Sequence, residues 1–263
     1  MRKVFLTMLL AVGYAASVMA VEIPKQGFGI QIGWAQPILR LNSPTNPATS
    51  KDSLSNTIKM NGFKVGLTYD ASYFAGFGSS MGINYTFGAY NGGWQSMHQN
   101  QPTTYPRKRQ MFTYNEIELF VDWQYKFEVA KETYLILYTG PTLQCGVTFD
   151  MRMDEQSENP LTGEITTDEG DWKSAYKIDK DDNIPVKDRT GKTHVPSDNA
   201  LTRLNITWGV GAGFQYKRYF LRGGYDFGLM NPYKHSDFAN EKHTRGRLDQ
   251  WNIRLGVYLW YHE

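Results

Sequence analysis

The sequence of 263 residues predicts an all-β protein, an eight-stranded antiparallel up-and-down transmembrane β-barrel with long extracellular loops. Three observations predict this fold class. Apolar and polar residues alternate with a period of two in eight separate segments, which is the pattern of strands with one apolar face. The chain holds 17 Tyr, 14 Phe, 7 Trp and 25 Gly, a composition that favours strands over helices. The connections between the segments are alternately long and short, as in outer-membrane barrels.

The first twenty residues have the pattern of a secretory signal peptide. Arg2 and Lys3 form a basic start, and the apolar stretch 4–16 that follows is too short to span a bilayer comfortably. Small residues up to Ala20 suit cleavage by a signal peptidase. We therefore expect residues 1–20 to be removed, which leaves 21–263 as a single barrel domain. The alternative, an N-terminal membrane anchor, is disfavoured by the short apolar stretch.

Each alternating segment has one aliphatic or aromatic face and one face of Gly, Ser, Thr, Asn, Gln and charged residues. Many segments reach ten residues or more, whereas strands in soluble sheets average about five or six. Roughly ten residues of tilted strand cross a bilayer. The barrel is expected to close, because lipid offers no partner for the backbone groups of a free sheet edge. The segments are 27–35, 62–70, 77–88, 117–129, 134–149, 204–217, 221–229 and 251–261.

The connections place the long loops at one end. Short turns are expected near Ser72, near Lys131 and at Arg218. The termini and short turns of an outer-membrane barrel face the periplasm, and its long loops face outward. A soluble lipocalin-like barrel is the alternative, but it would carry its apolar face inside. The long connections are 41–58, 91–110, 151–201 and 230–246.

Ten charged residues fall on the polar faces and are expected in the lumen. Five charges of each sign in a narrow lumen should pair, because an isolated buried charge is very costly. Eight strands leave an interior just wide enough for side chains, so a packed, salt-bridged lumen is favoured over an ion path. The core of this network is predicted as Lys64, Glu118, Asp122, Arg222, Asp226 and Arg254; the others are Asp70, Lys126, Glu128 and Lys217.

The C-terminal segment resembles the β-signal that the outer-membrane assembly machinery reads. Arg254, Gly256, Leu259 and Tyr261 occupy its polar, glycine, apolar and aromatic positions, although two more residues follow the aromatic. The segments 139–143, 209–217 and 224–229 are similar to the PorT-like outer-membrane β-barrel family. That resemblance covers most of the chain and implies fold and location. It implies no catalytic residues, and we do not carry over PorT's secretion-system role.

The long loops differ in charge. Residues 150–200 hold thirteen acidic and seven basic side chains, within an acidic extracellular loop at about 150–202. The segment 179–190 begins like a calcium loop but lacks the required glycine and final glutamate, so a solvated loop is favoured. Loops two and four are basic, through Arg107, Lys108 and Arg109 in one and Lys234, Lys242, Arg245 and Arg247 in the other. We expect either that the acidic loop packs over the basic loops as a lid, or that the basic loops bind lipopolysaccharide phosphates.

Catalytic and metal sites are not expected. The loop run His235, Ser236 and Asp237 holds the residue types of a nucleophilic triad, but adjacent loop residues cannot adopt the relay geometry. His98, His235 and His243 lack metal-ligand spacing, and the single cysteine, Cys145, excludes an intrachain disulfide. No cofactor is expected, and the near-balanced charge argues against nucleic acid as a partner.

The sequence predicts a monomeric outer-membrane protein of a Gram-negative (diderm) bacterium with a structural or surface-binding role. Its expected partners are outer-membrane lipid and lipopolysaccharide, the barrel assembly machinery, and an envelope protein. One alternative is a narrow ion or small-solute pore gated by the acidic loop. Another, less favoured, is an envelope enzyme acting on lipid A or peptide.

Overall fold

The computed structural model describes residues 26–42, 57–96, 106–176, 186–187, 193–194, 201–232 and 245–262. Several predictions fall outside the described residues. They concern residues 1–20, the calcium-like segment 179–190 apart from the backbone of 186–187, and His98, Lys234, His235, Ser236, Asp237, Lys242 and His243. No helix among the described residues is long and apolar enough to cross a membrane.

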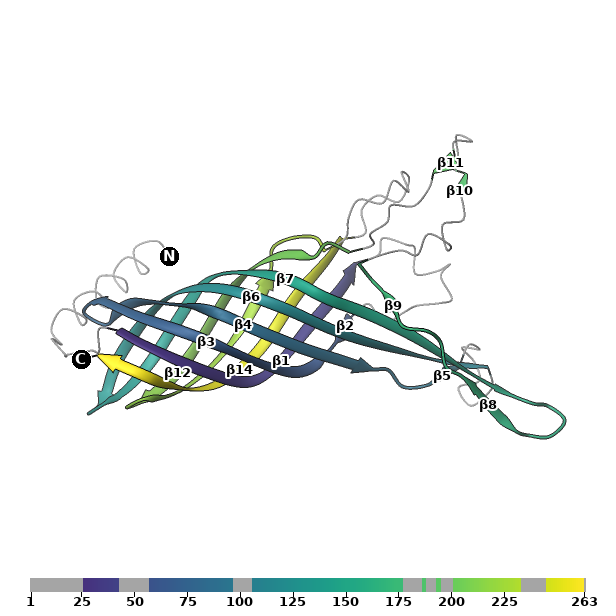
Figure 1. Ribbon diagram of the computed structural model, residues 1–263, viewed down its shortest axis with the longest axis horizontal. Helices are drawn as coiled ribbons and strands as arrows, with labels where there is room; N and C mark the ends of the chain where they lie inside the picture. Colours follow the sequence, from purple (N-terminus) through teal and green to yellow (C-terminus); the bar gives the residue numbers. More distant parts are fainter. Residues whose placement is uncertain are drawn as a thin grey trace, which may run out of the picture.

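Eight long strands pair into a closed ring. Each strand pairs antiparallel with its neighbour along the chain, and the first pairs with the last through a register from Gln26 opposite His262 to Asn42 opposite Arg245. Figure 1 shows the strands tilted around one axis. The eight-stranded antiparallel barrel is therefore confirmed. The strands are β1 (Gln26–Asn42), β3 (Asn61–Phe74), β4 (Phe77–Asn91), β6 (Arg107–Ala130), β7 (Thr133–Glu158), β12 (Leu204–Tyr216), β13 (Tyr219–Gly228) and β14 (Arg245–His262).

Three tight turns lie at the end of the barrel that also carries the C-terminus (Figure 1). They join β3 to β4, β6 to β7 and β12 to β13. Ala75, Gly76, Glu132 and Lys217 have positive φ there, which gives two-residue hairpins the twist of their strands. We call this the short-turn end and the opposite one the long-loop end. The predicted alternation of short and long connections is confirmed for the barrel strands.

Several strands are longer at the long-loop end than the sequence pattern indicated. β6 begins at Arg107 and β7 continues to Glu158, so residues assigned to loops two and three form strands. The pair extends beyond the barrel in Figure 1, flanked by β5 (Gln95–Ser96) on β6 and β8 (Ile165–Asp168) on β7. We call residues 107–112 and 151–158 with β5 and β8 the ribbon.

The remaining strands are short. β2 (Thr57–Lys59) pairs with β1, and β9 (Lys173–Ser174) pairs with β7. β10 (Val186–Lys187) and β11 (Thr193–His194) pair only with each other in the part of the chain that is described.

The two faces of the wall have opposite chemistry. Large apolar side chains on alternate residues point outward, such as Ile32 (61% exposed), Leu119 (52%) and Leu255 (57%). Their neighbours, such as Gln31, Glu118 and Arg254, are buried inside. Aromatic side chains including Tyr73, Phe74, Tyr216 and Tyr219 are exposed beside the short turns, as in the aromatic girdles of membrane barrels. An oily exterior around a polar interior is the arrangement that lipid requires.

Candidate functional site

The lumen contains two hydrogen-bonded layers of charged side chains. The first is centred on Lys64 of β3 and Glu118 of β6, whose Nζ and Oε2 atoms lie 2.7 Å apart. Thr86 and Asn84 of β4 donate to Glu118 at 2.9 and 3.2 Å. Both charged side chains are almost fully buried, so the carboxylate depends on these donors in place of water.

Gln250 of β14 joins this layer to a second carboxyl group. Its side-chain oxygen accepts from Lys64, and its Nε2 donates to Glu116 at 2.7 Å. The hydroxyl of Tyr114 donates to the other oxygen of Glu116 at 2.6 Å. Glu116 is not among the charges predicted for the lumen, although it lies two residues from Glu118 and so shares its face. The alternating segment 117–129, extended by one residue, contains it.

The second layer lies nearer the short-turn end and surrounds Asp70 of β3. Arg222 of β13 and Lys126 of β6 contact its Oδ2 at 2.7 and 3.0 Å. The Tyr258 hydroxyl donates to the same oxygen. Arg222 also donates to Ser80 at 2.7 Å. Two cations around one buried carboxylate hold β3, β6 and β13 together across the lumen.

Three of the predicted network residues are in the lumen without an ion pair within 4.0 Å among the described residues. Arg254 lies over the rings of Phe120 and Tyr138 and donates to the Tyr138 hydroxyl at 3.3 Å. Asp226 accepts from Asn252 at 2.9 Å. Asp122 is 4% exposed. The prediction that all ten charges form ion pairs is therefore wrong.

Two further residues of the predicted network, Lys217 and Glu128, lie near the turns and not inside the lumen. Lys217 is in the turn after β12, where its Nζ lies 3.7 Å from Glu132, and both side chains are about half exposed. Glu128 is only partly buried near the other turn. Fewer than ten of the predicted charges therefore lie in the lumen, because the alternation between inward and outward positions ends where a strand enters a turn.

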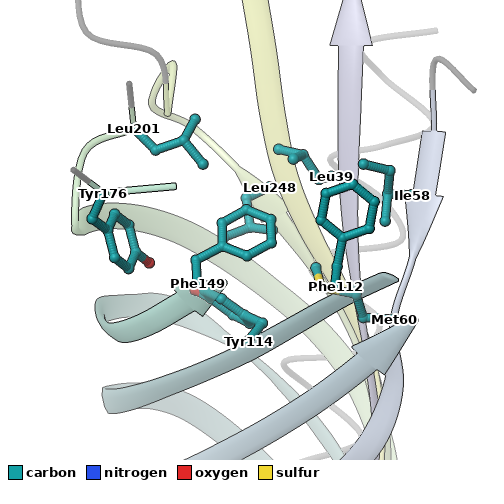
Figure 2. Packing of buried hydrophobic residues seen from close by; sticks show 9 residues of the cluster. All are labelled: Leu39, Ile58, Met60, Phe112, Tyr114, Phe149, Tyr176, Leu201 and Leu248. Atoms are coloured by element: carbon teal, nitrogen blue, oxygen red, sulfur yellow. The ribbon is translucent and has the colours of Figure 1, made fainter. Parts of the chain in front are cut away.

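An apolar cluster lies next to the first layer, toward the long-loop end. It includes the tyrosine that donates to Glu116, and its members come from the barrel strands β1, β6, β7 and β14, from β2, and from Met60, Tyr176 and Leu201 between strands (Figure 2). The Tyr176 hydroxyl lies where a side chain on Gly146 would begin, so only glycine leaves this aromatic room in the cluster. The apolar cluster consists of Leu39, Ile58, Met60, Phe112, Tyr114, Phe149, Tyr176, Leu201 and Leu248.

The basic triplet of loop two meets the acidic segment of loop three inside the ribbon. Arg107, Lys108 and Arg109 stand opposite Gln156, Glu155 and Asp154 in the β6–β7 register. Lys108 lies 2.6 Å from Glu155, and Arg109 lies 2.6 Å from Asp154. Among the described residues, the expected attraction between these two loops takes the form of cross-strand pairs.

Asp154 is the most enclosed charge of the ribbon. Burial of the carboxyl raises its pKa, but hydrogen bonds from Arg109 and Arg152 outweigh burial and hold the pKa below the ordinary aspartate value. Each guanidinium also lies over an indole, Arg109 over Trp94 at 4.7 Å and Arg152 over Trp172 at 5.5 Å. The ribbon is therefore stabilised by its side chains as well as by its backbone pairing.

The four residues that resemble the assembly signal do not form one cluster. Arg254 points into the lumen, while Leu259 is 56% exposed on the outside. Gly256 leaves room for the Phe220 ring, and the Tyr261 hydroxyl accepts from Gln215 at 2.6 Å. Among the described side chains no three His, Cys, Asp or Glu residues group together as metal ligands.

The closed ring, the apolar exterior and the hydrogen-bonded polar interior define the class of this protein. It is a small outer-membrane β-barrel, and we therefore refer to the long-loop end as extracellular and to the short-turn end as periplasmic.

Comparison with known proteins adds only structural likenesses. No family model matches the chain, and no curated protein matches its sequence. The attachment invasion locus protein Ail of Yersinia pestis, solved in complex with the heparin analogue sucrose octasulfate, is 10% identical, with a TM-score of 0.36 over 89% of this chain and 99% of that chain. Neisserial surface protein A is 12% identical, with a TM-score of 0.36 over 89% and 97%. The N-terminal β-barrel domain of Pseudomonas aeruginosa OprF is 9% identical, with a TM-score of 0.23 over 87% and 97%. At these values the likenesses carry no weight for function.

Proposed function

We propose that this chain is a non-conducting barrel of a diderm outer membrane, with a structural or surface-binding role carried by its extracellular ribbon. Residues 1–20 act as the cleaved signal peptide, and residues 21–263 form one monomeric domain. The assembly machinery reads Arg254, Gly256, Leu259 and Tyr261 before the barrel closes. A PorT-like affiliation and the absence of catalysis belong to the same proposal.

The occlusion of the lumen is the observation that supports this function. The layers around Glu118 and Asp70 fill the membrane-spanning part with paired side chains, and the apolar cluster lies across its extracellular side. An ion would have to displace the buried pairs and also pass the apolar cluster, and each step is costly. The ribbon, by contrast, exposes ordered backbone and side chains to the medium, where a partner can reach them.

The test is planar-bilayer conductance of the refolded chain lacking residues 1–20. A second form replaces residues 178–199 with a short Gly-Ser linker. This deletion is feasible because the Leu201 amide donates to the Ala175 carbonyl at 3.2 Å, so the two ends of the removed segment are close. The deletion retains Tyr176 and Leu201 in the apolar cluster. We expect no steady conductance from either form.

The second candidate function is a narrow pore gated by the acidic loop, and the net charge of −6 in residues 150–200 is the observation that favours it. Conductance that appears only after the deletion would establish this gate. Conductance of the intact protein would overturn the occluded lumen altogether. Both forms keep the whole ribbon. Heat-dependent gel migration is the control that both barrels are folded.

A further inference from the structure

Two arginines are neighbours on the outer face of the barrel at its extracellular end. Arg40 of β1 and Arg247 of β14 stand directly opposite each other in the strand register. Their side chains are 44% and 46% exposed. Between them lies Asp249, whose side chain is fully buried. Its carboxylate contacts the Nε atom of Arg40 at 2.9 Å and that of Arg247 at 2.8 Å.

The carboxylate orients both guanidinium groups. Asp249 also accepts from the Tyr225 hydroxyl at 2.7 Å and from the Gly228 amide at 2.9 Å. Four donors therefore hold its carboxylate in place. Only glycine fits at position 228, because a Cβ there would come within 2.4 Å of the Leu248 carbonyl oxygen and 2.9 Å of the Arg247 side chain. Both arginines use Nε for Asp249. The Nη2 of Arg40 also donates to the Tyr225 hydroxyl at 3.4 Å, which leaves its Nη1 and both terminal nitrogens of Arg247 without a partner among the described residues. Two cations and one anion give this site a net charge of +1.

The site adjoins the lipid-facing surface. The Tyr225 ring packs edge-on against Trp251 at 4.6 Å and against Phe227 at 4.7 Å. Trp251 and Phe227 are exposed members of the apolar exterior. On β14, Asp249 and Arg247 lie two and four residues before Trp251, which is toward the extracellular end. The guanidinium groups therefore lie where the acyl region of the outer leaflet gives way to its headgroups.

The ribbon provides an internal comparison. Arg109 and Arg152 also flank a fully buried aspartate, but their side chains are only 23% and 17% exposed. Each lies over an indole, and Glu169 contacts Arg152 at 3.4 Å. In that cluster the guanidinium groups are committed to protein partners. At Asp249 the guanidinium groups contact the carboxylate only through Nε and are about half exposed.

We propose that Arg40 and Arg247 bind the phosphate group of an outer-leaflet glycolipid. Planar guanidinium groups donate in pairs to phosphate oxygens, and the preset geometry reduces the ordering cost of binding. A lipid is favoured over free phosphate because the acyl chains would pack on the adjacent apolar exterior, whereas an exposed ion pair in water contributes little by itself. This inference concerns the lipid contact and is independent of conductance and of the ribbon's partner.

The experiment measures lipid retention by native mass spectrometry. The refolded protein is released from phosphatidylcholine nanodiscs that contain either lipid A with both phosphates or lipid A from which the phosphates have been removed. We expect the wild type to retain the phosphorylated form. The R40Q/R247Q variant should retain it about tenfold less, the loss expected for hydrogen bonds to charged groups. The matched control is K131Q/K217Q, which removes the same charge at the periplasmic turns.

A second variant separates loss of the binding site from misfolding of the barrel. R40K/R247K keeps the positive charge beside Asp249 but loses the paired donors, so we expect intermediate retention from a folded barrel. Equal retention by the wild type and R40Q/R247Q, or equal retention of both forms of lipid A, would overturn the proposal. Binding of inorganic phosphate to the detergent-solubilised wild type, with no preference for phosphorylated lipid A, would assign the arginines to free phosphate and also overturn it.

Discussion

Lys64 and Glu118 show how single residues stabilise this barrel. Their 2.7 Å contact lies in the lumen, where neither charge reaches water. A buried pair of this kind contributes less through its own attraction than through the cost of leaving one member alone. The effect of a substitution therefore depends on whether one partner or both are removed.

At the residue scale we predict that Lys64→Met destabilises the barrel by about 3–5 kcal/mol, because it leaves Glu118 buried and unpaired. The K64M/E118L double variant should recover most of this loss, since both charges are then replaced by apolar groups. The measurement is urea unfolding in lipid vesicles, followed by tryptophan emission. Lys108→Met is the control, because its pair with Glu155 is partly exposed and should contribute less than about 1 kcal/mol. A double variant as unstable as the single one would contradict the prediction.

At the element scale, the ribbon depends on side-chain pairing because it has no lipid around it. Asp154 of β7 accepts from Arg109 of β6 across the strand pair and from Arg152, two residues away on its own strand. Its pKa lies below the ordinary value of 3.8. Such a carboxyl contributes stability that is fully present above the ordinary pKa and is lost as the pH falls through the lowered one. The ribbon should therefore stay ordered at neutral pH and loosen only below about pH 4.

We predict that Asp154→Asn opens the ribbon even at neutral pH. Amide hydrogen exchange of residues 107–112 and 151–158 should rise about tenfold, as expected when a hydrogen bond to a charged group is lost. Exchange in the membrane-spanning strands should not change. Glu155→Gln is the matched control, because its side chain is 51% exposed and such pairs have little effect. Equal exchange in the two variants would show that backbone pairing alone orders the ribbon.

At the scale of the whole molecule, the position of the apolar face separates a membrane barrel from a soluble one. Leu119 of β6 points outward between Ile83 of β4 and Leu143 of β7. We predict that Leu119→Arg destabilises the vesicle-embedded barrel by about 2–4 kcal/mol, the cost of arginine facing the middle of a bilayer.

The comparison for Leu119→Arg is Leu161→Arg, at a site that is 93% exposed in the turn between β7 and β8. This substitution faces water in either kind of barrel and should change stability by less than about 0.5 kcal/mol. Unfolding in vesicles by urea measures both. If Leu119→Arg were as mild as Leu161→Arg, the apolar exterior would not face lipid.

The alternating segments made the fold predictable from the sequence alone. Strand number, pairing order and the position of the short turns follow from a period of two and from connection lengths, which are local properties of the chain. The inward position of Lys64, Glu118 and Arg254 follows in the same way. Strand ends were less predictable: the ribbon exists because Arg109 meets Asp154 across a register that only the paired strands define.

The alternation in the sequence assigns each residue to one face of its strand, and so predicts an apolar wall around a polar lumen. Which of the inward and outward charges meet depends on the folded barrel. Asp70 and Arg222 are 152 residues apart, and Arg40 and Asp249 are 209 apart. Such contacts depend on the tilt and stagger of strands in a closed barrel. A period of two assigns a residue to a face, but its height on that face, and so its partner, is set only when the ring closes.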